Sequence, residues 1–269
     1  METILITGAG SGIGAATAKL LSQREGIRLL LVGRRKGPLD EVCASLSHAD
    51  NHVTASVDVA DANALVDFLG SSLADLARSP LVAVFANAGV GGPNTFGEDD
   101  RWEEIIRINL TGTYNTVQAC HPWLRRAQGV KHVLVTSSVL ARFGVPGQSA
   151  YVASKTGLLG LVRSLAMEWS GEGVMVNALC PGWVDTEMAQ ASIQAMADAE
   201  GISFEASKNK QEALLPSGAM SSPEDMAQWV DFLFSGLGEA DDKRRVGTFT
   251  GQALDVNSGC LLYTSDAAD

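Results

Sequence analysis

The chain has 269 residues, of which 46% are hydrophobic and 28 are glycine, so it can form one large domain with a sizeable core or two small domains. Its formal net charge of −11 argues against nucleic acid or an anionic membrane as a partner, because both attract basic surfaces. No apolar run reaches the ~20 residues that span a bilayer, and the four scattered cysteines indicate neither a disulfide framework nor a metal site.

The first predicted element is a short apolar strand, Glu2–Thr7, which leads through a glycine-rich turn into a helical run. The turn reads Gly8-Ala9-Gly10-Ser11-Gly12-Ile13-Gly14. Free backbone N–H groups and the positive end of the helix dipole make such a turn an anion site, and the missing side chains let a pyrophosphate approach. The spacing is GxxxGxG rather than the GxGxxG dinucleotide fingerprint, and a flexible surface turn is the alternative.

The second predicted strand, residues 27–32, ends in the run Gly33-Arg34-Arg35-Lys36. About 20 residues after the glycines, an NAD site carries an acidic residue for the ribose 2′-OH, whereas an arginine accommodates the 2′-phosphate of NADP. No carboxylate stands there in this chain. Arg34 and Arg35 therefore favour NADP, with a solvated charge run as the alternative.

The remaining chain alternates between helices and strands. Strands are predicted at 52–57, 81–86, 131–138, 174–180 and 248–256, and helices at 39–46, 62–78 (capped by Asp61), 100–126, 151–171 and from 223 onward (capped by Ser222). Continuous apolar strands that alternate with helices predict an α/β fold with a seven-stranded parallel sheet covered on both faces, a doubly wound single domain. Residues 187–217 break the alternation. Residues 260–269 look foreign to the rest, and a cloning scar and native sequence are both open.

Tyr151 and Lys155 lie four residues apart on a predicted helix, so the phenol and the ammonium share one face. A cation about 4 Å away at an effective dielectric near 20 favours the phenolate by about 4 kcal/mol, or roughly three pKa units. Ser138 ends the preceding strand, and the Gly/Pro-rich loop 143–147 brings it back toward this helix, where its hydroxyl could polarise a carbonyl. The alternative is an ordinary buried tyrosine with a solvated lysine.

Together these stretches resemble the short-chain dehydrogenase/reductase family, and the match extends to about Gly259. The matching pieces are the glycine turn from Thr7 to Gly14, Asp58-Val59, Asn87-Ala88-Gly89, Asn109, Ser138, Tyr151-x-x-x-Lys155, and Pro181-Gly182 with Thr186. Ser138 lies 13 positions before Tyr151 (151 − 138), which is the family's usual separation. No single piece is decisive, but their joint occurrence in this order is specific.

The resemblance implies a reaction at these residues. Tyr151 would be the general acid in ketone reduction and the general base in alcohol oxidation, and Ser138 would hold and polarise the substrate oxygen. Lys155 would lower the pKa of Tyr151 and bind the nicotinamide ribose. Asn109 would hold a water that links Lys155 to solvent; a helix-interior asparagine bonded to backbone is the alternative.

The resemblance also implies a Rossmann fold with a dinucleotide cofactor, NADP rather than NAD. The expected contacts are Gly8, Ser11, Gly12, Ile13 and Gly14 in the turn, Arg34 and Arg35, Asp58 at the adenine amino group, Val59 at the ring, Asn87, Ala88 and Gly89 along the ribose, and Pro181, Gly182, Val184 and Thr186 around the nicotinamide. Two departures stand out. NADP members often carry a basic residue within the turn, where this chain has Ser11, and Asn257-Ser258-Gly259 replaces an Asp-Gly-Gly type of ending.

Residues 187–217 correspond to the family's mobile substrate lid, for which an apolar cover and plain packing are both open. With Leu140, Phe143, Val145 and Trp183 nearby, we expect a mainly hydrophobic ketone or secondary alcohol. Family members are usually homotetramers that pair the helices 100–126 and 151–171, and the start METILITG lacks a signal peptide's charged region, which predicts a cytoplasmic enzyme. An NAD-dependent alcohol dehydrogenase and a non-catalytic dinucleotide-binding protein are the alternatives.

Overall fold

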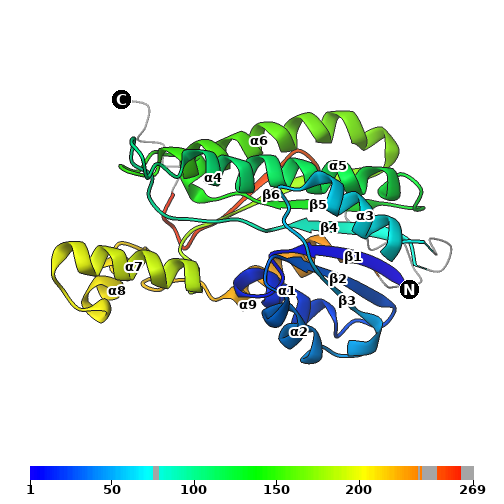
Figure 1. The fold of residues 1–269 in the computed structure, drawn as a ribbon, viewed down its shortest axis with the longest axis horizontal. Coiled ribbons are helices and arrows are strands. Elements are labelled where there is room, and N and C mark those ends of the chain that lie inside the picture. Colours follow the sequence, from blue (N-terminus) through cyan, green and yellow to red (C-terminus); the bar gives the residue numbers. More distant parts are fainter. Residues whose placement is uncertain (75–78, 236, 238–246, 262–269) are drawn as a thin grey trace.

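A computed structural model describes residues 1–74, 79–235, 237 and 247–261 of the chain. Seven parallel strands form one sheet in the order β3-β2-β1-β4-β5-β6-β7, with helices on both faces (Figure 1). The strands are β1 Glu2–Thr7, β2 Ile27–Gly33, β3 Val53–Ser56, β4 Leu81–Ala86, β5 Lys131–Thr136, β6 Val174–Pro181 and β7 Ala253–Val256. This confirms the predicted doubly wound Rossmann architecture.

The helices fall into two layers and one extension (Figure 1). One layer holds α1 Gly12–Leu21, α2 Lys36–Ala44 and α9 Pro223–Leu233, and the other holds α3 Ala62–Ser72, α4 Trp102–Ile106, α5 Gly112–Leu124 and α6 Ser149–Trp169. Short helical turns cover Ala49–Asn51, Val139–Ala141 and Ser170–Glu172. The helices α7 Glu187–Glu200 and α8 Phe204–Glu212 project from the side of the molecule. Each layer has its own apolar core against the sheet.

Local sequence explains where these elements begin. The β4 strand is buried at every position, as a central parallel strand covered on both faces should be. Asp61 caps α3 by accepting a hydrogen bond from the Ala64 N–H at 3.0 Å. Ser222 caps α9 in a reciprocal capping box with Asp225, and Pro223 stands at the first helical position.

The predicted helix boundaries needed correction. The helix expected at 39–46 begins earlier, at Lys36, because a helix tolerates Pro38 in its first turn. The helix expected at 62–78 ends at Ser72, and residues 75–78 lie outside the described part. The helix expected at 100–126 is interrupted by a π-helical turn, Arg107–Thr111, between α4 and α5.

The last strand is shorter than the predicted 248–256, and before Ala253 side-chain bonds alternate with the backbone bonds of Gly251 and Gln252 to β6. Val176 N–H donates to the Thr250 hydroxyl, and Asn177 donates to the Phe249 carbonyl and accepts from the Gln252 N–H. The acidic–basic patch at 238–245, interpreted from sequence as a surface loop, lies outside the described residues, as do 262–269 of the proposed tail.

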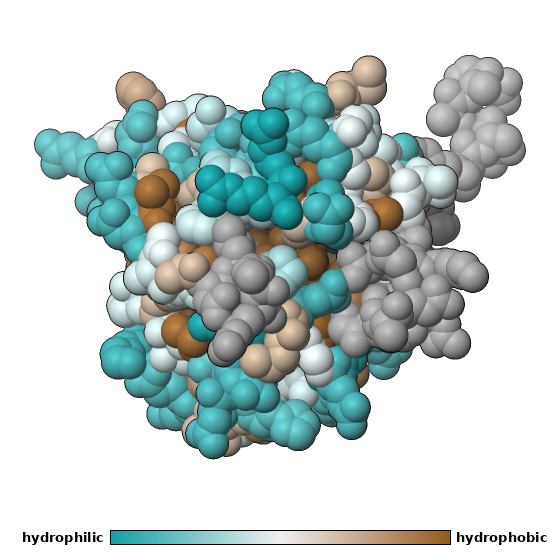
Figure 2. Space-filling view, turned by 90° about the vertical axis from the view of Figure 1, so that its right-hand side faces the viewer, coloured by the Kyte–Doolittle hydropathy of each residue, from teal (hydrophilic) through white to brown (hydrophobic). Residues whose placement is uncertain are grey.

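The surface at the amino ends of the strands is mainly hydrophilic, with smaller apolar patches between polar side chains (Figure 2). Within the described ranges, no helix has both the length and the hydropathy to cross a membrane.

Candidate active site

Most of the sequence-predicted site residues lie at or just after the carboxyl ends of six strands, so the fold brings them to one edge of the sheet. Asn109 lies in a helical turn, and Tyr151 and Lys155 lie on α6. The chain order reverses between β1 and β4, and in open α/β sheets ligands bind at such a switch point. The glycine turn follows β1, and Asn87, Ala88 and Gly89 follow β4. The two halves of the predicted site therefore flank the switch point.

The glycine turn has the geometry of an anion cradle. Gly8 and Gly12 have positive φ values of 66° and 51°, which a side chain would strain. A Cβ on Gly14 would collide with the Gly8 carbonyl, so the turn closes only around glycine. Ser11 occupies the N-cap of α1 without a side-chain capping bond, which leaves the first-turn N–H groups available for a ligand oxygen. These features fit a dinucleotide pyrophosphate.

Asn87 ties three central strands together. Its Nδ2 donates to the Thr7 carbonyl at 3.2 Å, and its Oδ1 accepts from the Thr136 hydroxyl at 3.0 Å. The Thr7 hydroxyl in turn accepts from the backbone N–H groups of Asn87 and Ala88, both at 3.0 Å. The structure thus gives Asn87 the role of joining strands. Two residues later, Gly89 has no side chain and leaves space next to Lys155. A Cβ on Gly89 would lie 3.5 Å from Lys155 Nζ.

Charged side chains follow the carboxyl ends of β2 and β3. Arg34 is exposed and, among the described residues, has no carboxylate within ion-pair distance, whereas Arg35 lies 3.5 Å from Glu187 at the start of α7. Asp58 accepts from the Ala60 N–H at 3.0 Å and pairs with Arg107 Nη1 at 3.4 Å. Arg107 comes from the π-helical turn, and the sequence did not single it out. Arg34 is therefore an exposed cation at the end of β2, and its charge contributes to lowering the pKa of Glu104.

The structure brings Ser138, Tyr151 and Lys155 together. Ser138 lies close enough to Tyr151 to oppose the rise in its pKa that burial causes, and Lys155 Nζ lies 5.6 Å from the centroid of the Tyr151 ring. Lys155 is buried and donates from Nζ to the Thr136 carbonyl at 2.7 Å. Ser137, next to Ser138, donates to the Lys155 carbonyl at 2.8 Å and fixes strand and helix to one another.

Burial shifts the pKa values of both Tyr151 and Lys155. Desolvation raises the pKa of Tyr151 above its ordinary value, and the hydrogen bond from Ser138 opposes that rise without overcoming it. Desolvation also lowers the pKa of Lys155 to about 8, a shift that the neighbouring Cys180 thiol partly opposes. Lys155 is not among the causes of the pKa shift of Tyr151 in the protein alone, and the lowering of the phenol pKa by Lys155 stays a prediction.

Asn109 lies in the π-helical turn with its side chain fully engaged. Its Oδ1 accepts from Val90 N–H at 2.8 Å, and its Nδ2 donates to the Val90 carbonyl at 2.9 Å and to the Ser154 hydroxyl at 3.2 Å. The alternative given from sequence, a helix-interior asparagine bonded to backbone, therefore describes the side chain of Asn109. The role expected from the family resemblance, a water relay to Lys155, stays a prediction.

The segment after β6 forms the far end of the site. Pro181 closes the strand, and Gly182 packs against the Asn257 backbone so closely that a Cβ would lie 2.9 Å from it. Val184 forms a bridge with Ser221. The Thr186 hydroxyl caps α7, and its methyl group lies against Gly12, where a Cβ would come within 3.1 Å. The start of α7 therefore touches the glycine turn.

The segment 187–217 is helical, as predicted, and its apolar residues divide into two groups. Met188 lies against Gly91 in the loop after β4, where a Cβ would come within 2.8 Å of its sulfur. Ile193 is buried, and its carbonyl accepts a hydrogen bond from the Ser207 hydroxyl of α8. Plain packing thus accounts for Ile193, and Met188 remains a candidate for a cover over the site.

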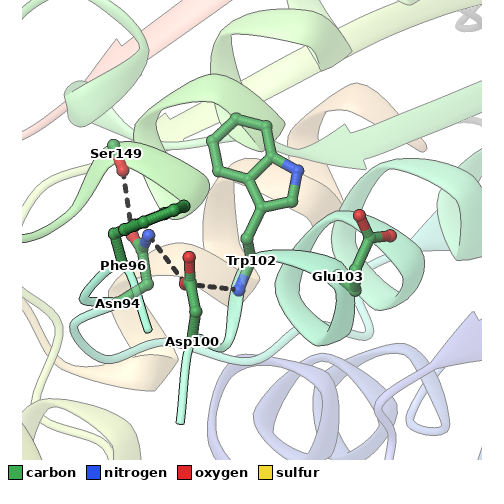
Figure 3. Close-up of a pocket in the computed structure, with 6 residues that line it drawn as sticks. All are labelled: Asn94, Phe96, Asp100, Trp102, Glu103 and Ser149. Atoms are coloured by element: carbon green, nitrogen blue, oxygen red, sulfur yellow. Dashed lines mark hydrogen bonds between the residues drawn. The ribbon is translucent and has the colours of Figure 1, made fainter. Parts of the chain in front are cut away.

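A hollow of about 480 Å³ lies beside the start of α6 (Figure 3). Its lining residues are Asn94, Phe96, Asp100, Trp102, Glu103 and Ser149. Sequence reasoning passed over this loop because its bonds reach partners far along the chain, and Asn94 contacts Ala150 56 residues away.

Comparison with known proteins places this geometry in context. The model of the short chain dehydrogenase family matches residues 2–197. The chain is 30% identical to D-beta-hydroxybutyrate dehydrogenase of Cupriavidus necator, covering 87% of this chain and 91% of that protein. It is 32% identical to acetoacetyl-CoA reductase of Rhizobium meliloti, covering 95% and 96%. A crystal structure of an actinorhodin polyketide ketoreductase variant with NADPH superposes with a TM-score of 0.85 at 28% identity, covering 96% and 97%.

Proposed function

The chain belongs to the short-chain dehydrogenase family of oxidoreductases, and from that premise we propose that it transfers a hydride between NADP(H) and a ketone or secondary alcohol. The observation that carries the proposal is the group of Ser138, Tyr151 and Lys155 at the carboxyl edge of the sheet, next to a glycine turn that fits a pyrophosphate. We assign residues 1–259 to one catalytic domain, with a lid at 187–217.

The cofactor supplies or accepts the hydride when it is bound, and the chain supplies orientation and proton transfer. The Ser138 hydroxyl holds the substrate oxygen, and the Tyr151 phenol gives its proton to that oxygen as the carbonyl is reduced. In alcohol oxidation the phenolate takes the same proton back. The raised pKa of Tyr151 suits the acid role, because it keeps the phenol protonated in the protein alone.

Lys155 remains the residue that stabilises the phenolate left by proton transfer. Its ammonium is already next to the Tyr151 ring, and a lysine with a pKa of about 8 exchanges its own proton near neutral pH. Gly89 leaves the space above Lys155 free for the ribose that would share its hydrogen bonds.

The exposed Arg34 supports NADP over NAD. Its guanidinium stands unpaired among the described residues at the end of β2, and no carboxylate follows Val32 in the position that would bind a ribose 2′-OH. Removal of a hydrogen bond to a charged group costs about 1.5–3 kcal/mol. We therefore expect Arg34→Ala to weaken NADPH binding by about 10- to 100-fold and to leave NADH binding nearly unchanged.

The deciding experiment is turnover of a ketone and alcohol panel, followed by nicotinamide absorbance with both cofactors. Because named relatives act on β-hydroxybutyrate and acetoacetyl-CoA, the panel starts with short 3-oxo and 3-hydroxy compounds and extends to larger hydrophobic ketones. Tyr151→Phe should keep cofactor affinity and lose about 10²- to 10⁴-fold in kcat. Unchanged kcat in this variant would refute the role of Tyr151, and a strong NADH preference would refute that of Arg34.

The second candidate is an NAD-dependent dehydrogenase of the same fold. Its physiological direction would be oxidation, the direction that the name of the Cupriavidus necator relative describes, and the NADH arm of the panel tests its cofactor. Cofactor binding without turnover across the whole panel would instead favour a non-catalytic dinucleotide-binding protein.

A further inference from the structure

The helix that carries Tyr151 and Lys155 has no cap of its own. The α6 helix starts at Ser149, only two residues before Tyr151, and its N-cap residue Gln148 makes no capping bond with its side chain. Uncapped N-terminal N–H groups leave the first turn free to fray. The catalytic phenol lies in that first turn, so its position depends on what satisfies these groups.

Asn94, from the loop after β4, takes the place of the missing cap. Its Oδ1 accepts from the Ala150 N–H at 2.9 Å. The same oxygen accepts from the Ser149 hydroxyl at 3.2 Å (Figure 3). The Asn94 backbone N–H also donates to the Gly147 carbonyl at 2.9 Å. Asn94 is only 9% exposed, so water competes poorly for these bonds.

The other end of the same amide holds a second helix. Asn94 Nδ2 donates to Asp100 Oδ1 at 3.2 Å, and this oxygen also accepts from the Trp102 N–H at 3.0 Å, where α4 begins (Figure 3). The N-cap residue of α4, Arg101, makes no side-chain capping bond either. One Asn–Asp pair therefore caps both α4 and α6.

A second contact joins α6 to the segment that follows α4. The α4 helix continues into the π-helical turn, where Asn109 bonds to the Ser154 hydroxyl of α6. The segment of α6 between Ala150 and Ser154 is thus held at both of its ends by the chain between β4 and α5. Tyr151 lies inside this span, and Ser138 lies close enough to it to act on the pKa of the phenol.

We propose that Asn94 is a positioning residue for the proposed reaction: by capping α6 from outside the helix, it fixes the Tyr151 phenol against Ser138. The proposal rests on the proposed function of Tyr151. Misplacement of a catalytic group by about 1 Å can cost about 10²-fold in rate. Loss of the cap should therefore lower kcat without changing cofactor affinity.

The test compares Asn94→Ala with Ser222→Ala, which removes an N-cap of the same kind from α9, a helix without site residues. We expect Asn94→Ala to lower kcat by about 10- to 100-fold with the NADPH Kd within about threefold of wild type. Ser222→Ala should lower only the unfolding midpoint. Equal kcat in the two variants, or a parallel loss of NADPH affinity in Asn94→Ala, would overturn the proposal.

A second pair of variants exchanges the amide of Asn94 and the carboxylate of Asp100, and tests whether restoring their hydrogen bond restores kcat. Asn94→Asp alone keeps the acceptor for Ala150 but sets a second carboxylate against Asp100. The pair Asn94→Asp with Asp100→Asn restores a donor between the two side chains and an acceptor for the Trp102 N–H. We expect kcat to fall in the single variant and to return to within about threefold of wild type in the pair; a pair no better than the single variant would contradict the proposal.

Hydrogen exchange separates this inference from the proposed function, since it needs no substrate. In wild type the Ala150 amide bonds to Asn94, and the Val152 amide makes the first bond within the helix, to the Gln148 carbonyl at 2.8 Å. Asn94→Ala should speed exchange of both amides, and Ser222→Ala should not. If the substrate panel shows no turnover but exchange rises, the proposed function fails and the capping of α6 stands; unchanged exchange overturns the capping itself.

Discussion

At the scale of single residues, Lys155 carries a charge that its surroundings disfavour. It is buried beneath the site, and desolvation lowers its pKa from 10.5 to about 8. Below pH 8 the folded protein therefore holds an ammonium that would be more stable in water. Its contacts with the Thr136 carbonyl and the Tyr151 ring reduce this cost but do not remove it. Such a residue fits a site kept for chemistry at the expense of stability.

We expect Lys155→Met to stabilise the fold at neutral pH while it abolishes turnover. The shift corresponds to about 3 kcal/mol of unfavourable free energy at pH 7, and loss of the bond to the Thr136 carbonyl reduces the net gain to about 1–3 kcal/mol. A folded-state pKa below the unfolded value means that wild type gains stability as pH rises from about 8 to 10.5. Urea unfolding without cofactor should show the advantage of the variant shrinking over that range. A constant advantage across it would contradict this account.

Gly14→Ala should remove cofactor binding and destabilise the protein. The new Cβ would meet the Gly8 carbonyl, a backbone atom that cannot move without opening the turn. Overpacking of this kind costs about 1–3 kcal/mol. Gly37→Ala is the matched control, because nothing lies within 4 Å of a Cβ there. Calorimetry with NADPH and thermal unfolding measure the two effects, and similar values for both variants would refute the anion cradle.

Residue spacing alone revealed part of the site. Tyr151 and Lys155 are four apart on one helix, so their proximity follows from helical geometry. Asn94 and Arg107 were not predictable in the same way. Their partners, Ala150 and Asp58, lie 56 and 49 residues away in the chain, and no local pattern records a bond over that distance.

At the scale of elements, apolar strands were the most predictable feature. The bounds of β1 and β4 match the prediction, because central strands buried on both faces appear as uninterrupted apolar runs. The helix at 100–126 was predicted without its π-helical turn. That turn contains Asn109, which bonds to Val90 19 residues earlier, a contact that amphipathic periodicity cannot reveal.

The contact between α7 and the cofactor loop yields a prediction about affinity. Arg35 lies 3.5 Å from Glu187, and both side chains are largely exposed, so the pair contributes only about 0–1 kcal/mol to stability. If Arg35 binds a 2′-phosphate as proposed, Glu187 competes with that phosphate for the guanidinium. Glu187→Gln should therefore tighten NADPH binding by up to about fivefold, leave NADH binding unchanged and shift the unfolding free energy by less than about 0.5 kcal/mol. Equal tightening of both cofactors in titrations would show that Glu187 acts on the common part of the dinucleotide.

At the scale of the whole molecule, the small residues of α6 lie on two faces of the helix, one packed against the same chain and one facing outward. Four small residues of this helix could permit close approach of another helix: Ala153, Ser154, Gly157 and Gly160. Two of the four instead face the same chain. Ser154 is buried against Asn109, and a Cβ on Gly157 would lie 3.1 Å from Leu110. Close approach within the chain therefore explains half of the pattern, and Ala153 and Gly160 are left for another surface.

These two residues share a face with Met167, because positions seven apart on a helix lie one above the other. Met167 is 84% exposed, and a Cβ on Gly160 would meet only Arg163, at 4.0 Å. We propose that this face of α6 pairs with a second copy in a homotetramer. Met167→Glu should then lower the assembly state in sedimentation velocity, since it would bury two carboxylates in one symmetric contact. Val66→Glu changes a 54% exposed apolar residue on α3 and should sediment as wild type. An unchanged assembly in Met167→Glu would place the interface elsewhere on the molecule, and a monomeric wild type would refute the tetramer.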